Sequence, residues 1–187
     1  MIGLKLKRAF QRLRGKTTEE FELEYLLAHG MKVGENVHIF SPSMIDAERP
    51  FLISIGDDVT ISTYVTILTH DASTHFVNCG TKLGRVEIGD RVFIGTKSII
   101  LCGTHIGSDV IVGAGSLVSH DLPSGFVYAG VPARKICTIE EYRKKYEKLR
   151  EERPDFSAIR PWDQWANAPE EEKQLMIDGL SDGPGFF

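Results

Sequence analysis

The stretch IGDRVFIGTKSIILCGTHIGSDVIVGAGSLVS, residues 88–119, repeats every six residues. A branched aliphatic residue opens each hexad, and a glycine follows it in four of them. The aliphatic positions are Ile88, Ile94, Ile100, Ile106, Val112 and Val118. Neither the helical period of 3.6 residues nor the strand period of two produces this spacing. The repeat therefore has to be interpreted before any single motif.

A six-residue repeat is typical of short strands joined by tight corners, where glycine is expected to supply strained turn conformations. Three such sides, roughly eighteen residues, close a triangular coil that stacks on the next at about 4.8 Å. The aliphatic then points to the narrow axis. The same spacing upstream gives residues 31–137 room for about five coils, through Val33, Ile39, Ile55, Ile61 and Ile67. We therefore predict an all-β repeat, a parallel β-helix. An ordinary β-sandwich does not account for a shared six-residue phase.

The two ends of the chain are expected to be helical. Residues 1–30 form an N-terminal helical segment, in which 18–29 suit a cap over the open end of the coils. Residues 1–16 hold six basic residues and no acid, so they either contact an anionic membrane face or pack on the protein with solvated charges. Residues 138–187 form a charged C-terminal helical extension.

Composition excludes several classes of protein. A net charge of −4 over 187 residues gives no basic field for nucleic acid. Three cysteines, irregularly spaced, indicate neither a disulfide framework nor a zinc cluster. The sequence has no apolar run of transmembrane length and no signal-peptide core, so a cytoplasmic location is expected, with the inner membrane face as an option through residues 1–16.

The hexads break off between Ile67 and Ile88, in the segment ILTHDASTHFVNCGTKLGRVE. This segment must leave the stack, so we predict an excursion loop over residues 70–85. Loops on a rigid scaffold commonly carry function. The loop is dense in reactive side chains: His70, Asp71, Ser73, Thr74, His75, Asn78 and Cys79.

The hexads, the looped-out THD segment and the closing AGVPARKI (129–136) resemble the hexapeptide-repeat acyltransferases, over residues 31–137. The most similar branch holds the galactoside, maltose and polysaccharide O-acetyltransferases, beside the xenobiotic acetyltransferases. The resemblance implies a left-handed β-helix, although parallel crossovers are otherwise right-handed. It also implies acetyl-CoA as co-substrate, no metal, and a homotrimer with sites between subunits.

By resemblance, His70 is the general base of an O-acetyltransferase acting on a sugar or polysaccharide precursor. A histidine suits this role because its pKa of about 6.5 lets it accept a hydroxyl proton at cellular pH. Asp71 either orients the imidazole or is a loop-turn aspartate. N-acetylation of an amino sugar and acetylation of a xenobiotic stay open.

Further site residues follow from the same resemblance. Positions expected along the pantetheine arm are Phe93, Thr96, Ala114 and Ser119, and those at the phosphates are Arg134 and Lys135. Small residues such as Thr96 and Ala114 also simply fit coil corners. Candidates for acceptor binding are Asp46 and Glu48, in a non-hexad insertion, and Ser73 and Asn78 in the loop. Taken singly, each of these four is better explained as an ordinary solvated loop residue.

Three alternatives to acetyl transfer remain. A γ-class carbonic anhydrase would use His70 and His105 on zinc, but it lacks a third ligand near Val110 unless His75 folds back. Cys79 as a nucleophile has no base at a fixed spacing. A non-catalytic scaffold needs neither the loop histidine nor the cationic residues Arg134 and Lys135 that end the repeat region.

Overall fold

The structure is a computed structural model that describes residues 18–186. It contains two compact units, which divide between Ile139 and Glu140. The predicted membrane-contacting segment, residues 1–16, lies outside the described residues. None of the helices within 18–186 has the length and apolar composition of a membrane span.

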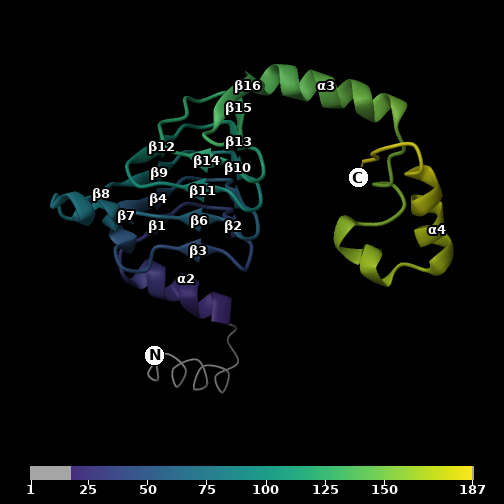
Figure 1. Ribbon diagram of the computed structural model, residues 1–187. Helices are drawn as coiled ribbons and strands as arrows, with labels where there is room; N and C mark the ends of the chain where they lie inside the picture. The colour runs from purple at the N-terminus through teal and green to yellow at the C-terminus, as the bar shows by residue number, and fades with distance from the viewer. Residues whose placement is uncertain (1–17, 187) are drawn as a thin grey trace. The chain divides into compact units, whose positions relative to one another are not determined.

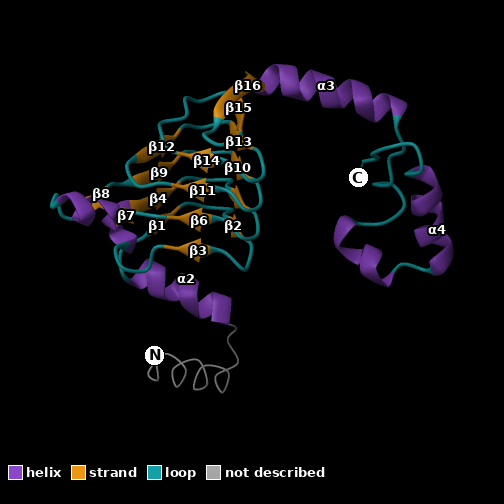
Figure 2. Cartoon of the chain, in the orientation of Figure 1, coloured by secondary structure: helices purple, strands orange, loops and turns teal. Residues whose placement is uncertain are grey.

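The first unit is a β-helix whose strands form three parallel sheets, one on each side of the coil (Figures 1 and 2). Face A consists of β1 (Lys32–Val33), β4 (Ile53–Ile55), β9 (Val86–Ile88) and β12 (Thr104–Ile106). Face B consists of β2 (His38–Ile39), β5 (Thr60–Ile61), β10 (Val92–Ile94), β13 (Val110–Val112), β15 (Phe126–Ala129) and the antiparallel β16 (Arg134–Thr138). Face C consists of β3 (Met44–Ile45), β6 (Thr66–Ile67), β11 (Ile99–Ile100) and β14 (Leu117–Val118).

Strand register confirms the predicted length of the coil and locates its interruptions. Ile99 pairs with Leu117, eighteen residues later. Met44 pairs with Thr66, twenty-two residues later, so four residues are inserted between β3 and β4. Thr66 pairs with Ile99, thirty-three residues later, so fifteen are inserted between β6 and β9. Both insertions therefore leave the stack at the same corner, between faces C and A, one coil apart.

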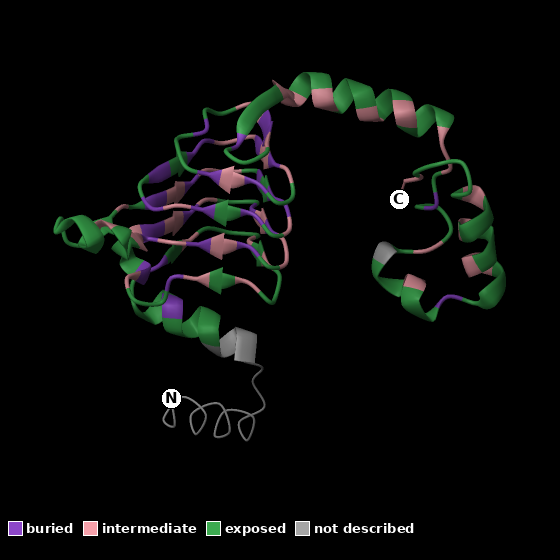
Figure 3. Cartoon of the chain, viewed as in Figure 1, coloured by how far each residue is buried: buried purple, intermediate pink, exposed green. Residues whose placement is uncertain are grey.

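The core is a column of small aliphatic side chains along the axis of the coils. Figure 3 shows that buried residues, in purple, recur from coil to coil. The hexad aliphatics from Ile55 to Val118 are buried, as predicted, and Val33 and Ile39 are partly buried at the first coil. The small residues four positions after each aliphatic are buried too: Val92, Ser98, Thr104, Val110 and Ser116. Because these two sets alternate with outward residues, each short strand buries its inner face.

The prediction that glycine supplies turn conformations holds at Gly103 and Gly115, with φ of 77° and 69°, but not at the glycines that directly follow the aliphatics. Other left-handed corner positions are held by residues such as Asp58 and Lys97, with φ of 56° and 60°. Gly95 instead permits close stacking, because a Cβ there would lie 2.5 Å from the backbone nitrogen of Ala114 in the next coil. The repeat glycines are thus required by the separation of the coils.

The ends of the stack are closed differently. Helix α2 (Thr18–Ala28) precedes the first coil, and Leu26 and Met31 join the buried cluster of the axis. At the other end, β16 folds back on β15, and Lys135 Nζ lies 3.3 Å from the ring centroid of Phe126.

The fifteen-residue insertion forms a hairpin that protrudes from the stack (Figure 1). It consists of β7 (His70–Asp71), the 3₁₀ helix η2 (Ala72–Val77) and β8 (Lys82–Leu83), with β7 and β8 antiparallel. The shorter insertion carries the 3₁₀ helix η1 (Pro50–Leu52). We call the larger one the excursion hairpin.

The second unit holds most of helix α3 (Ile139–Glu152), the 3₁₀ helix η3 (Trp162–Asn167) and helix α4 (Glu170–Gly179). Phe156 is buried and makes an edge contact with the ring of Trp165. Arg160 donates to both carboxylate oxygens of Glu172, which links the segment before η3 to α4.

Candidate active site

Asp46 and His70 are brought together by the shared corner of the two insertions. Asp46 follows β3, and His70 follows β6, which lies beside β3 in face C. The Asp46 N–H donates to the carbonyl of Ile67 at 3.0 Å, which extends the pairing past the ends of the strands. Residues 24 positions apart in sequence therefore face one another across one coil spacing.

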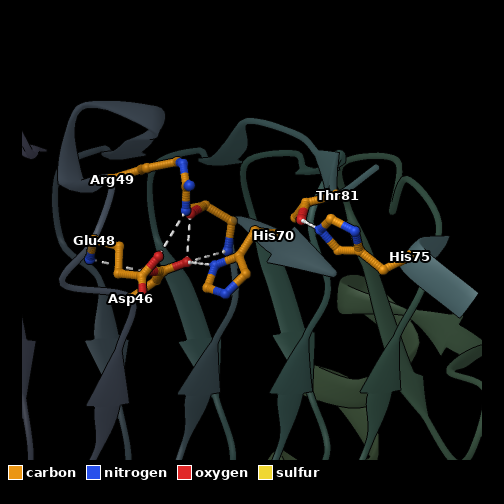
Figure 4. Close-up of polar contacts among 7 residues, drawn as sticks. Asp46, Glu48, Arg49, His70, His75 and Thr81 are labelled. Carbon is orange, nitrogen blue, oxygen red and sulfur yellow. Dashed lines mark hydrogen bonds and ion pairs between the residues drawn. The ribbon is translucent and has the colours of Figure 1, made fainter. Parts of the chain in front are cut away.

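The Asp46 carboxylate is buried and fully engaged by hydrogen bonds (Figure 4). Oδ2 accepts from His70 Nδ1 at 2.6 Å, from the Thr69 hydroxyl at 2.5 Å and from the Thr69 N–H at 3.0 Å. Oδ1 accepts from the Glu48 N–H at 3.0 Å. Four donors thus fix the position of one carboxylate.

These contacts determine the charge of Asp46. Burial acts to raise its pKa, but the hydrogen bonds from Thr69, the Glu48 backbone and His70 outweigh it and lower the pKa to about 2. At neutral pH the group is therefore an ionised carboxylate, which only accepts hydrogen bonds.

The ionised Asp46 fixes the tautomer of His70. Because the carboxylate cannot donate, the proton of the neutral imidazole resides on Nδ1, and Nε2 keeps its lone pair. The His70 side chain is 28% exposed, and no hydrogen bond to Nε2 occurs within residues 18–186. The arrangement places a proton acceptor on a partly exposed side chain at the base of the excursion hairpin.

Asp71 does not orient His70, so that prediction is corrected. Its carboxylate accepts from the Ser73 N–H at 2.9 Å and caps η2. These hydrogen bonds lower the pKa of Asp71, which is fully exposed. The position beside the imidazole belongs to Asp46, which was predicted as an acceptor contact; its side chain is only 3% exposed and already accepts four hydrogen bonds from the protein.

Glu48 lies in the same insertion as Asp46, with its side chain pointing outward. The Glu48 side chain is 68% exposed and pairs with Arg49 Nη1 at 2.9 Å. Figure 4 draws both residues beside Asp46. Glu48 thus remains accessible at the rim of the site, whereas its backbone N–H supports Asp46.

The other predicted loop residues serve the shape of the excursion hairpin. The N–H groups of Ser73 and Asn78 close turns onto Asp71 and His75. His75 Nε2 lies 2.8 Å from the Thr81 hydroxyl, away from His70 in Figure 4. Cys79 is exposed, and its thiol donates to the Val77 carbonyl.

The predicted cofactor residues occupy two corners and one face. Thr96 and Ala114 stack at the corner between faces B and C, where the Gly115 N–H donates to the Thr96 carbonyl at 2.8 Å. Ser119 is exposed at the corner between faces C and A, the corner from which His70 leaves. Within one chain, the length of a face C strand separates Thr96 and Ala114 from the corner of His70.

The remaining three cofactor candidates are accessible on the outside of face B. Phe93 on β10 is 45% exposed. Arg134 and Lys135 are exposed on β16, at the last coil. The structure does not gather them with His70 into one pocket of a single chain.

The histidines weighed for a zinc site lie apart. His105 sits on face A, where its Nδ1 is 3.6 Å from Glu87 Oε2. No group of three or more His, Cys, Asp or Glu side chains suited to a metal occurs in the part of the chain that the structure describes.

Thr69 is the site residue that the sequence interpretation missed. It lies next to His70, but a threonine in a loop carries no chemical signal of its own. Counting register across both insertions would have placed Asp46 beside it, because each insertion begins directly after a face C strand. That count requires the first coil to be aligned with the later ones, and the hexads of the first coil are the least regular in sequence.

The chain was compared with known families and structures. The family model described as "Hexapeptide repeat of succinyl-transferase" matches residues 85–120. The putative acetyltransferase YvoF of Bacillus subtilis is 38% identical over 65% of this chain and 68% of its own length. The galactoside O-acetyltransferase of Escherichia coli is 33% identical over 60% of this chain and 59% of its own length.

A solved structure is also similar. The hexapeptide-repeat acetyltransferase VCA0836 of Vibrio cholerae, complexed with acetyl coenzyme A, is 27% identical, with a TM-score of 0.54 over 59% of this chain and 61% of that one. The chain thus spans about three fifths of the galactoside and Vibrio enzymes. This likeness and the three parallel sheets fit a left-handed β-helix. The chain belongs to the hexapeptide-repeat acyltransferase family.

Proposed function

We propose that this protein is an acetyl-CoA-dependent O-acetyltransferase that acetylates a hydroxyl of a sugar or polysaccharide precursor. The observation that carries the proposal is the Asp46–His70 pair, in which Asp46 holds Nδ1 of a partly exposed imidazole and leaves Nε2 without a protein partner among the described residues. Galactoside acetylation by one relative and acetyl-CoA binding by another support the substrate classes.

The residues act on the proton of the acceptor. His70 Nε2 takes the hydroxyl proton as the acceptor oxygen attacks the thioester carbonyl, which an unassisted alcohol does poorly at neutral pH. Asp46 stabilises the positive imidazolium that forms, because its carboxylate is ionised and 2.6 Å from Nδ1. Nε2 then returns the proton to the leaving thiolate.

The co-substrate would be held by exposed groups on faces B and C. Phe93 offers an exposed ring for the pantetheine arm, and Thr96 and Ala114 offer the stacked corner beside it. Arg134 and Lys135 are accessible cations suited to phosphate groups. Since these residues and His70 are not gathered in one chain, we propose that sites form between the subunits of a homotrimer.

The outward side chains support such an assembly. Faces B and C expose large apolar residues, namely Met44 at 55%, Phe93 at 45% and Ile99 at 39%. The outward residues of face A are instead polar: Lys32, Ser54, Glu87 and His105. Light scattering of the purified protein measures the mass, and a monomer would contradict the trimer.

We also propose that the protein acts in the cytoplasm, at the inner face of the membrane. Use of acetyl-CoA favours the cytoplasm, and the six basic residues of 1–16 favour contact with an anionic membrane surface. Sedimentation with anionic vesicles at low and high salt tests the contact. Absence of binding at both salt concentrations would remove it.

The activity is tested by release of free coenzyme A with a thiol reagent, using a panel of galactosides, maltose, amino sugars and drug hydroxyls. His70→Gln should lower turnover by about 10²–10⁴-fold. His105→Gln, an exposed histidine on face A, is the matched control and should keep it. Turnover unchanged in His70→Gln, or absent with every acceptor, would overturn the proposal. A preference for amino sugars would change the proposed reaction from O-acetylation to N-acetylation.

A further inference from the structure

Thr69 places a buried hydroxyl against the carboxylate that orients His70. The residue is 0% exposed. Its hydroxyl and its N–H supply two of the three donors at Asp46 Oδ2, at 2.5 and 3.0 Å, and His70 Nδ1 supplies the third. One residue therefore controls most of the hydrogen bonding at the oxygen that meets the imidazole.

We propose that Thr69 is a positioning residue for acetyl transfer. Its hydroxyl holds Asp46 Oδ2 in line with His70 Nδ1, which keeps the proton on Nδ1 and the lone pair on Nε2. This inference rests on the proposed role of His70 as general base. Thr69 does not contact the reacting atoms; it acts through Asp46.

The surroundings of Asp46 explain why the Thr69 hydroxyl is needed to hold its carboxylate. The other carboxylate oxygen has one donor, the Glu48 N–H at 3.0 Å, in an insertion whose outer side chains are exposed. An aspartate held only there is free to turn about its terminal torsion, which has broad minima. The backbone of Thr69 is well placed to prevent this, because its carbonyl accepts from the Gly84 N–H at 3.0 Å and joins the two ends of the excursion hairpin.

A purely structural hydroxyl is available for comparison in the next coils. Thr104 is 3% exposed, and its hydroxyl donates to the Leu101 carbonyl at 2.8 Å. Both threonines are buried and satisfied, so loss of either hydroxyl leaves an acceptor short of a donor. The difference is that the acceptor for Thr69 is the partner of His70.

The experiment compares Thr69→Val, Thr69→Ser and Thr104→Val in the full chain. The first measurement is ¹⁵N NMR of labelled histidine, which reports the tautomer of His70 at neutral pH without any substrate. The second is the steady-state kinetics of coenzyme A release. Thr69→Val should populate the Nε2–H tautomer and lower kcat by about tenfold or more, with KM for acetyl-CoA nearly unchanged. Thr69→Ser should restore both properties, and Thr104→Val should match the wild type.

The outcomes separate this inference from the proposed function. A wild-type tautomer population and kcat in Thr69→Val would overturn the positioning role. So would equal losses of kcat in Thr69→Val and Thr104→Val with the tautomer unchanged, because both would then act through stability. If the wild type transfers no acetyl group, the function fails, and the tautomer of Thr69→Val still decides whether Thr69 holds Asp46.

Discussion

His70 Nδ1 lies 2.6 Å from Asp46 Oδ2, although the residues belong to different coils and different insertions. The pair combines a buried, ionised carboxylate with an imidazole that is partly exposed. The imidazole is therefore oriented from inside the protein, while its own side chain reaches the surface.

Replacing Asp46 by Asn should slow acetyl transfer on the order of 10²-fold while the fold is kept. The amide removes the negative charge that stabilises the imidazolium, and its NH₂ group favours the wrong tautomer of His70. The measurement is kcat for coenzyme A release. Asp71→Asn is the control, since Asp71 caps η2 and does not contact His70; equal losses in the two variants would contradict the assignment.

Acid stability should report the depressed pKa of Asp46. A carboxyl group with a folded pKa of about 2, against an ordinary value of 3.8, stabilises the native state above about pH 4, and that contribution is lost as the pH falls through 2. Its size is about 2 kcal/mol. Urea unfolding should therefore show a gap between wild type and Asp46→Asn that narrows on acidification. The comparison cancels the contribution of Asp155, whose pKa is also lowered, chiefly by Ser157 and then by Arg150. A gap independent of pH would contradict the expectation.

Shortening one axial side chain should cost far more than shortening an outward one. Ile94 is 0% exposed in the column of the core, so Ile94→Ala should lower the free energy of unfolding by about 2–5 kcal/mol. Ile136 on β16 is 62% exposed, and Ile136→Ala should change it by about 0.5 kcal/mol or less. Chemical denaturation of both variants tests the difference, and similar losses would refute the inward orientation.

A methyl group at Gly95 should disturb the neighbouring corner. The added Cβ would lie 2.5 Å from Ala114 N and 2.8 Å from its Cα, so Gly95→Ala should destabilise the protein by about 1–3 kcal/mol. Because that corner is proposed to meet the pantetheine arm, KM for acetyl-CoA should rise as well. In Gly80→Ala nothing lies within 4 Å of the new Cβ, and the cost comes only from the left-handed backbone there. KM for acetyl-CoA should stay constant in that control. An equal rise in KM in both variants would contradict the proposal that the Gly95–Ala114 corner binds the pantetheine arm.

The sequence predicted the architecture well because one local rule is applied in every coil. The six-residue phase identified the inward residues from Ile55 to Val118 and the eighteen-residue coil. It assigned the wrong cause to the glycines that directly follow the aliphatics, since a sequence shows that such a glycine recurs but not that Ala114 lies against Gly95.

The site was predicted less completely because its contacts are not local. His70 stood out as a reactive residue in a broken repeat, whereas its partner lies in another break of the repeat, 24 residues away. The adjacent Asp71 was the obvious candidate by sequence, but neighbouring side chains on a strand point in opposite directions. Asp46 reaches His70 because both follow face C strands, and only the register reveals that.

The hydrogen bond from the Gly84 N–H to the Thr69 carbonyl brings the two ends of the excursion hairpin together at the stack. The coils before and after it pair in one continuous register, so residues 71–83 can vary in length and composition without altering the stack. Under the proposed function, such a protein can acquire a new acceptor by exchanging residues 71–83, while His70, Asp46 and the surface proposed for coenzyme A are inherited unchanged.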